Sequence, residues 1–249
     1  MSNNDHNQLT VDTVDKYFYE LSKELKKEYG RGKEFEIVVV GGAAIMFNYD
    51  FRGTTTDVDG YVSMGGSVKD AANRVAEKYG ISTDWLNSDF KRTNSYSARL
   101  TQFSKFYKNY NQILSVRTIN AEYLIAMKLV SFRAYKRDRS DILGILETHK
   151  KMNKPISYEQ INKAVVDLYG GWDRIEESAQ EFIRKVTQDT VYNYALEVDL
   201  ENENKTLLID FEKRYQDVLT EENLDTVLAM LQSKKNVNSP VLKPRGPKL

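Results

Sequence analysis

The alternation of apolar and polar residues predicts a chain in which helices surround a few short strands. Residues 11–29 carry apolar and aromatic side chains at helical spacing among lysines and glutamates, so an amphipathic helix is expected there. Residues 35–40 (FEIVVV) form an apolar, β-branched run broken only by Glu36, which indicates a buried central strand. Two glycines end this strand, and a helix is expected over residues 43–47.

The middle of the chain continues this pattern less regularly. Residues 57–62 (DVDGYV) begin by alternating acids with Val58, as a half-buried strand does. A helix capped by Ser67 is expected over residues 67–79, whereas the stretch 80–111 has no clear period and receives no assignment. The remaining expected elements are a strand over 112–119 and helices over 120–135, 140–150, 158–169, 172–186, 207–219 and 221–231.

This order of elements predicts an α+β fold, with a small mixed sheet flanked by helices and followed by a helical second half. We expect a core domain over residues 1–150 and a helical domain over 151–233. Residues 234–249 hold three of the four prolines together with polar residues, which is typical of a disordered tail.

Composition narrows the chemistry. The chain has no cysteine, which excludes disulfides, thiolate metal sites and thiol nucleophiles. Its two histidines, His6 and His149, leave little for an imidazole metal site or a Ser-His-Asp triad. The catalytic groups that remain are carboxylates, lysines and hydroxyls.

The charge balance and the absence of apolar runs limit the partners. The formal net charge is zero, so binding of a polyanion would require a local patch of basic residues. The polar start lacks a signal peptide's apolar stretch, and no run approaches the ~20 apolar residues of a bilayer span, so we expect a cytoplasmic protein with no membrane partner. The basic and aromatic residues that could form an RNA patch, or merely a solvated face, are Lys105, Phe106, Tyr107, Lys108, Tyr110, Arg133, Lys136, Arg137 and Arg139.

Asp57 and Asp59 are the first candidates for chemistry. They stand two apart on an expected strand, so both carboxylates project from one face, ~7 Å apart at the backbone. Two such acids repel each other unless a cation lies between them, and Mg²⁺ or Mn²⁺ suits oxygen ligands. The ordinary alternative is a strand end with two solvated acids.

Glycines and hydroxyls near these acids suit a phosphate. Gly41 and Gly42 stand where a strand turns into a helix, so a phosphate can approach backbone N–H groups there. Arg52, Thr54 and Thr56 supply donors for phosphate or ribose oxygens. Close packing of the glycines and an ordinary polar loop are the alternatives.

Lys128 interrupts an otherwise apolar helical segment, residues 123–132. A buried ammonium costs several kcal/mol unless an anion meets it, and that anion is either a carboxylate or a nucleotide phosphate. Alternatively, its stem extends to water. Asp138 and Asp141 follow three residues apart, and each either completes the site or pairs with neighbouring arginines.

These segments together resemble a known superfamily. Val40-Gly41-Gly42 followed by Arg52-x-Thr54-x-Thr56-Asp57-Val58-Asp59 resembles the signature of the nucleotidyltransferase (DNA polymerase β-like) superfamily. The segment Leu124-x-Ala126-Met127-Lys128-Leu129, with Arg133, Asp138 and Asp141, is similar to the second block of the AbiEii/MenT-like toxins and related uncharacterised nucleotidyltransferases. The resemblance covers residues 35–146.

The resemblance implies a set of roles. Mg²⁺ would bind Asp57 and Asp59, the phosphates of an NTP would lie near Gly41 and Gly42, and Lys128 would contact the triphosphate. Of the downstream acids, Asp141 rather than Asp138 would belong to the active site. The branch further implies RNA, notably tRNA, as acceptor and a cognate antitoxin as partner.

Two departures from the superfamily pattern leave other functions open. The expected strand 112–119 lacks the third carboxylate of many members, and Gly60 directly follows the second acid. The first hypothesis is transfer of a nucleoside monophosphate to RNA by a toxin. The second is transfer to a small molecule such as an aminoglycoside, and the third is nucleotide binding without turnover. A cationic small molecule would need an acidic cleft, for which the candidates are Asp173, Glu176, Glu177 and Glu181.

Overall fold

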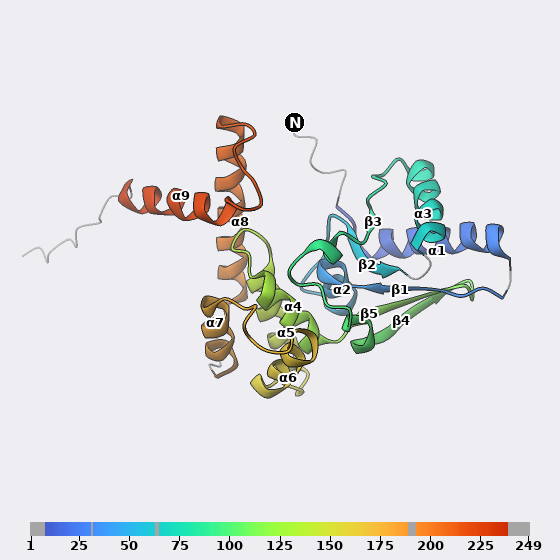
Figure 1. Cartoon of the computed structure of the whole chain (residues 1–249), viewed down its shortest axis with the longest axis horizontal. Coiled ribbons are helices and arrows are strands. Elements are labelled where there is room, and N and C mark those ends of the chain that lie inside the picture. Colours follow the sequence, from blue (N-terminus) through green and yellow to red (C-terminus); the bar gives the residue numbers. More distant parts are fainter. Residues whose placement is uncertain (1–7, 31, 63–64, 189–192, 239–249) are drawn as a thin grey trace, which may run out of the picture. The chain divides into compact units, whose positions relative to one another are not determined.

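The computed structural model describes residues 8–30, 32–62, 65–188 and 193–238, and its core is a five-stranded mixed sheet with helices around it (Figure 1). This confirms the expected α+β class. The strand order is β3-β2-β1-β5-β4. The strands are β1 (Phe35–Val39), β2 (Val58–Val62), β3 (Leu86–Asn87), β4 (Ser104–Tyr110) and β5 (Leu114–Ile119).

The apolar run of β1 makes it the central strand, as its composition predicted. Ile37, Val38 and Val39 are each 0% exposed. β1 pairs antiparallel with β2 and parallel with β5, so its backbone groups are satisfied on both sides. Each outer strand is paired on its inner side: β3 is parallel to β2, and β4 is antiparallel to β5.

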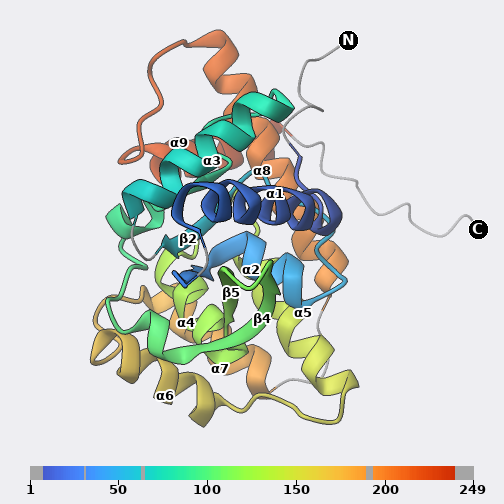
Figure 2. The ribbon, with the colours of Figure 1, turned by 90° about the vertical axis from the view of Figure 1, so that its right-hand side faces the viewer.

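The two faces of the sheet differ because side chains alternate along each strand. One face, to which Ile37, Gly60 and Val116 belong, is covered by α1 (Val11–Tyr29) and α3 (Gly65–Tyr79), which lie along the same side of the sheet in both views (Figure 2). Phe18 of α1 supplies the aromatic centre of this layer. Its ring lies 5.9 Å from that of Trp85 and 5.8 Å from that of Tyr110.

The helices follow the predicted segments with shifts at their ends. α1 has the predicted bounds, and Ser67 lies inside α3 instead of capping it, because two glycines extend that helix toward its N-terminus. The helix expected to reach Tyr135 ends at Ser131, because Phe132 adopts a left-handed backbone at φ 34°. The other helices of this part are α2 (Gly41–Asn48), α4 (Ala121–Ser131), α5 (Asp138–Lys151), α6 (Tyr158–Tyr169) and α7 (Glu177–Gln188).

Strand β4 lies in the stretch that received no assignment. A β-bulge between Phe106 and Lys108 shifts its register against β5, so apolar and polar residues do not alternate along it. Two short 3₁₀ helices, η2 (Asp89–Arg92) and η3 (Leu100–Phe103), precede it.

The chain divides into two compact units. The first consists of residues 1–132 and 141–192, so α6 and α7 belong with the sheet. The second consists of residues 133–140 and 193–249 and contains α8 (Tyr194–Arg214) and α9 (Leu224–Asn238). α8 starts earlier than expected, and α9 includes the first residues of the expected tail, while residues 239–249 lie outside the described part. In the part of the chain that is described, no helix is long and apolar enough to cross a membrane.

Candidate functional site

The bend between β1 and α2 has the geometry of an anion site. Gly41 has φ +60°, a left-handed conformation that favours glycine, and α2 begins at this residue. The N-cap, Val40, offers no side-chain hydrogen bond to the first turn. The first N–H groups of α2 therefore need another acceptor, and the positive end of the helix dipole favours an anion.

The paired aspartates lie beside this bend. Asp57 and Asp59 are half-buried, whereas Val58 and Gly60 between and after them are buried, so both acids project from one face of β2. A Cβ built on Gly41 would lie 3.7 Å from Asp59 Oδ2.

Asn87, which was not among the predicted site residues, lies beside the same acids. Its Nδ2 donates to Asp57 Oδ2 at 3.4 Å. It is opposite Asp59 in the parallel pairing of β2 and β3. Because it comes from the stretch without a hydrophobic period, no sequence pattern places it there.

Arg52 packs directly on the second glycine of the bend. A Cβ on Gly42 would lie 2.5 Å from Arg52 Nη2 and 3.2 Å from Thr55 Oγ1, so this position requires glycine for close approach. A buried hydroxyl, that of Thr55, lies at the bend. Thr56 is exposed and donates to Asp57 Oδ1 at 3.1 Å.

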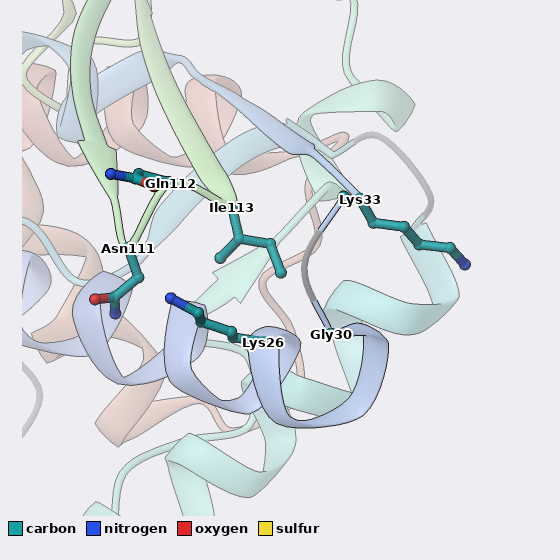
Figure 3. Close-up of a pocket in the computed structure, with 7 residues that line it drawn as sticks. Lys26, Gly30, Lys33, Asn111, Gln112 and Ile113 are labelled. Atoms are coloured by element: carbon teal, nitrogen blue, oxygen red, sulfur yellow. The ribbon is translucent and has the colours of Figure 1, made fainter.

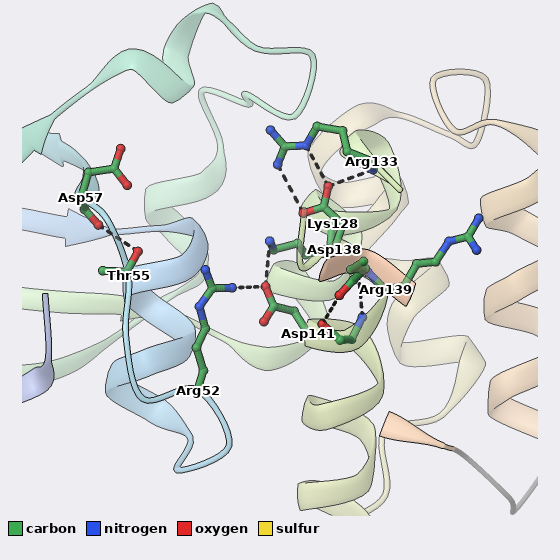
Figure 4. Close-up of polar contacts among 10 residues, drawn as sticks. Arg52, Thr55, Asp57, Lys128, Arg133, Asp138, Arg139 and Asp141 are labelled. Carbon is green, nitrogen blue, oxygen red and sulfur yellow. Dashed lines mark hydrogen bonds and ion pairs between the residues drawn. The ribbon is translucent and has the colours of Figure 1, made fainter. Parts of the chain in front are cut away.

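Two cations meet one buried carboxylate beside the bend (Figure 4). Lys128 Nζ lies 2.8 Å from Asp141 Oδ2, and Arg52 Nη1 donates to the same oxygen. The side chains of Arg52, Lys128 and Asp141 are 13%, 10% and 2% exposed. Lys128 is therefore buried, as predicted, and the anion that meets it is a carboxylate of α5.

One face of α5 holds the segment that carries Arg52. The ring of Phe51 lies against Gly144, where a Cβ would come within 2.6 Å of ring atoms. The hydroxyl of Tyr49 lies 3.1 Å from His149 Nε2. Since Asp141 is on the same helix as these residues, three successive contacts hold this segment against α5.

Burial shifts the titration of the Tyr49–His149 pair. Desolvation raises the pKa of Tyr49, with Glu122 adding to the effect. Desolvation also lowers the pKa of His149, partly offset by a hydrogen bond with the Lys154 backbone. Both side chains are thereby held in their neutral forms.

The other acid of this segment, Asp138, belongs to the second unit. It is 0% exposed and accepts from Arg133 Nε at 2.9 Å and from the Arg133 backbone N–H at 3.0 Å. In the same unit, the buried Glu201 of α8 accepts from the backbone N–H groups of Arg139 and Ser140 at 3.0 and 3.2 Å. Asp138 is thus part of a structural ion pair, and Glu201 caps the start of α5.

Three of the basic and aromatic residues of β4 contact other elements of the first unit. Lys108 and Tyr110 both donate to Asp15 of α1, and burial raises the pKa of Tyr110. The ring of Tyr107 stacks on Phe47 at 4.6 Å. Phe106 alone among these aromatic residues is largely exposed, at 61%.

The carboxylates suit a metal only in part. Among residues 8–30, 32–62, 65–188 and 193–238, no three histidine or acidic side chains come together as a metal cluster. β5 has no acid, and the pairing of β1 with β5 places Thr118 opposite Val39. Asp57 and Asp59 nevertheless fit Mg²⁺, which binds through one or two carboxylates and completes its shell with water and phosphate oxygens.

A separate pocket lies at the other end of the sheet, before β1 and at the turn between β4 and β5 (Figure 3). Lys26 and Lys33 lie at its edges, and Asn111 and Gln112 of the turn have positive φ. Because β1 separates it from Gly41, this pocket is not part of the site around the bend.

Comparison with known proteins shows the family of the chain. Residues 16–178, more than half of the chain, match a family described as "Nucleotidyltransferase of unknown function (DUF6036)". No curated protein and no solved structure matches the chain significantly.

Proposed function

The chain belongs to this family of nucleotidyltransferases, and we propose that it transfers a nucleoside monophosphate from an NTP to an acceptor hydroxyl. The observation that carries the proposal is the convergence at one bend of an uncapped helix start, a guanidinium and the Asp59 carboxylate. A triphosphate would bind to the helix start and the guanidinium, and a metal ion would bind to the Asp59 carboxylate.

The nucleotide phosphates would lie at the start of α2. Backbone N–H groups from Gly41 onward and the guanidinium of Arg52 face this position, and Lys128 adds a second cation through their shared partner Asp141. Both cations come from a largely water-excluded environment, where their interaction with phosphate is stronger than in bulk solvent.

Asp57 and Asp59 would hold Mg²⁺ or Mn²⁺, which would neutralise charge on the transferred phosphate. In the reaction, the acceptor oxygen forms a bond to the α-phosphorus and the bond to the bridging oxygen breaks. Pyrophosphate leaves, and the hydroxyl proton is released to solvent. Asn87 would orient Asp57 through the hydrogen bond described above.

Within the active site we assign Asp141 a positioning role and no direct part in activating the acceptor. Its Oδ2 already accepts from both Lys128 and Arg52, and its side chain is 2% exposed. A carboxylate bound to two cations is poorly placed to take a proton from an acceptor. It instead fixes the direction of both cations.

For the acceptor we propose RNA, such as tRNA, with the protein acting as the toxic partner of a cognate antitoxin in the cytoplasm. Support comes from the similarity of the Lys128–Asp141 segment to the AbiEii/MenT-like branch. The acids suggested for a small cationic acceptor, Asp173, Glu176, Glu177 and Glu181, are all exposed. Two of them, Glu177 and Glu181, lie on the side of α7 opposite the buried Ala179 and Ile183.

A second candidate is Mg-NTP binding without turnover, which the missing carboxylate on β5 favours. Calorimetry with Mg-ATP and Mg-CTP tests binding, and incubation with α-labelled NTPs and either total RNA or an aminoglycoside panel tests transfer. We expect label on RNA from the wild type and a loss on the order of a thousandfold or more for Asp59→Asn.

Three other outcomes are informative. Binding of NTP without transfer to any acceptor supports the second candidate. Label on an aminoglycoside but not on RNA identifies the small molecule as the acceptor. Absence of NTP binding contradicts the proposal altogether. Induced expression in bacteria tests the toxin role separately, because equal growth with wild type and Asp59→Asn excludes it.

A further inference from the structure

The face of the sheet opposite α1 and α3 carries one row of side chains that runs across four strands. Tyr61 of β2 pairs with Val38 of β1, Val38 pairs with Arg117 of β5, and Arg117 pairs with Phe106 of β4. Directly paired residues share a face, so all four side chains lie on the same side of the sheet. Strand spacing puts the two aromatic residues at the ends of the row about 14 Å apart.

Both aromatic side chains of this row are accessible. Phe106 is 61% exposed and Tyr61 is 40% exposed, whereas the aromatic residues of the opposite face, such as Tyr110, are buried. An exposed aromatic ring on a strand face offers a flat surface on which a base can stack, and every base can use it.

Cations accompany the two rings. Lys91 Nζ lies 4.5 Å from the centre of the Tyr61 ring. Arg117 uses Nε and Nη2 to hold Ser104 and is 31% exposed. One acid of this face, Glu36, lies 3.9 Å from Arg117 Nε and offsets part of that charge. The face thus combines rings for bases with two cations for phosphates.

The row leads to the site around the bend. Asp59 stands two residues before Tyr61 on β2, so its carboxylate projects from the same face. A chain lying along the row would therefore bring its end or an internal hydroxyl beside the aspartate pair.

We infer that the accessible side chains of this row, Tyr61, Arg117 and Phe106, bind the acceptor as a single-stranded polynucleotide, with bases stacked on Phe106 and Tyr61 and phosphates near Arg117 and Lys91. Val38 is buried between Tyr61 and Arg117 and takes no part in the contact. The inference rests on the proposed function and adds to it the surface that selects a polymer as acceptor. A small-molecule acceptor would not need rings spread over four strands.

Fluorescence anisotropy with short labelled oligouridylate and oligothymidylate tests the inference, at low salt because phosphate contacts weaken with salt. We expect Phe106→Ala and Tyr61→Ala each to weaken binding about fivefold to a hundredfold, as for loss of one stacking ring. Comparison of the Kd for oligouridylate with that for oligothymidylate distinguishes RNA from DNA as the polymer that binds this face.

Tyr19→Ala is the matched control. Tyr19 is 45% exposed and has Lys23 Nζ 4.4 Å from its ring centre, as Tyr61 has Lys91, but it lies on α1. We expect it to leave binding unchanged. Unchanged binding by Phe106→Ala and Tyr61→Ala, an equal loss with Tyr19→Ala, or no binding of either oligonucleotide by the wild type overturns the inference.

Mg-NTP calorimetry on the same proteins separates this inference from the proposed function. If the wild type binds NTP and Phe106→Ala binds the oligonucleotides as tightly as the wild type, the inferred role of the row is excluded. The proposed nucleotidyl transfer is not affected by that result. Absence of NTP binding in the wild type removes the proposed function itself.

Discussion

Lys128 and Asp141 form a buried ion pair, 2.8 Å apart, that joins α4 to α5 beside the glycine bend. Asp141→Asn would remove the charge shared by Lys128 and Arg52 and leave two cations poorly compensated. Removing one partner of a buried pair costs about 3–5 kcal/mol, so we expect a loss of that size in the free energy of unfolding, measured by urea denaturation.

The control is Glu147→Gln on the same helix, which breaks a more exposed pair with Lys151. Its cost should stay below about 0.5 kcal/mol. Equal effects of the two substitutions would contradict the positioning role of Asp141. If Asp141 positions the cations, Asp141→Asn should also weaken Mg-NTP binding in calorimetry.

Gly42→Ala should weaken nucleotide binding by displacing Arg52. The new Cβ would lie 2.5 Å from Arg52 Nη2, and the guanidinium would have to move away from the start of α2. Loss of one charge-assisted hydrogen bond, worth about 1.5–3 kcal/mol, predicts a roughly tenfold to hundredfold rise in the Kd for Mg-NTP.

Gly66→Ala serves as its control, because a Cβ there would meet nothing within 4 Å and the residue lies in the helix α3. It should leave the Kd unchanged and stabilise the fold by up to about 1 kcal/mol. An unchanged Kd in Gly42→Ala would show that Arg52 does not contact the nucleotide.

Gly144→Ala should destabilise the fold through Phe51. Its Cβ would come within 2.6 Å of the Phe51 ring, and overpacking of this kind costs about 1–3 kcal/mol. Phe51→Leu in the same chain removes the crowding ring, so the Gly144→Ala penalty should shrink in the double variant. Denaturation of all four proteins of this cycle measures the coupling, and strict additivity would contradict the contact.

Acidification should destabilise the protein in part through His149. Burial lowers the pKa of His149 in the folded state, so the unfolded chain binds its proton more readily. The stability due to neutral His149 is present above its unfolded pKa of about 6.5 and is lost as the pH falls below that value.

His149→Gln should therefore lose less stability than the wild type between pH 7.5 and pH 5.5, as measured by urea denaturation at each pH. The second histidine, His6, is retained in both proteins, so its contribution cancels in the comparison. Identical pH dependence of the two proteins would exclude a role for His149.

The elements that sequence predicts best are those with a strong local period. α1 and α6 have their expected bounds because their apolar residues recur at helical spacing over three or more turns. β1 is likewise evident because its β-branched run is buried on both faces. β4 was not predicted because its bulge breaks the alternation on which a strand prediction depends.

The site was predictable only in its local part. Asp57 and Asp59 share a face because of their spacing, and the burial of Lys128 follows from its apolar neighbours. Contacts between distant segments left no such pattern. The ring of Phe51 against Gly144, the Thr55 hydroxyl near Gly42, and Asn87 beside Asp57 all depend on how the chain returns on itself.

The parallel pairing of β1 with β5 has a consequence for biosynthesis. Phe35 and Leu114 are paired although they stand about 80 positions apart in the chain, so the centre of the sheet closes only after β5 has left the ribosome. The ion pair of Arg52 can form only after Asp141, which comes later still in the chain, has also emerged. A nascent chain that has emerged only as far as the two aspartates therefore carries Arg52 without Lys128 and Asp141, and the contacts that fix Arg52 form only once α5 has folded.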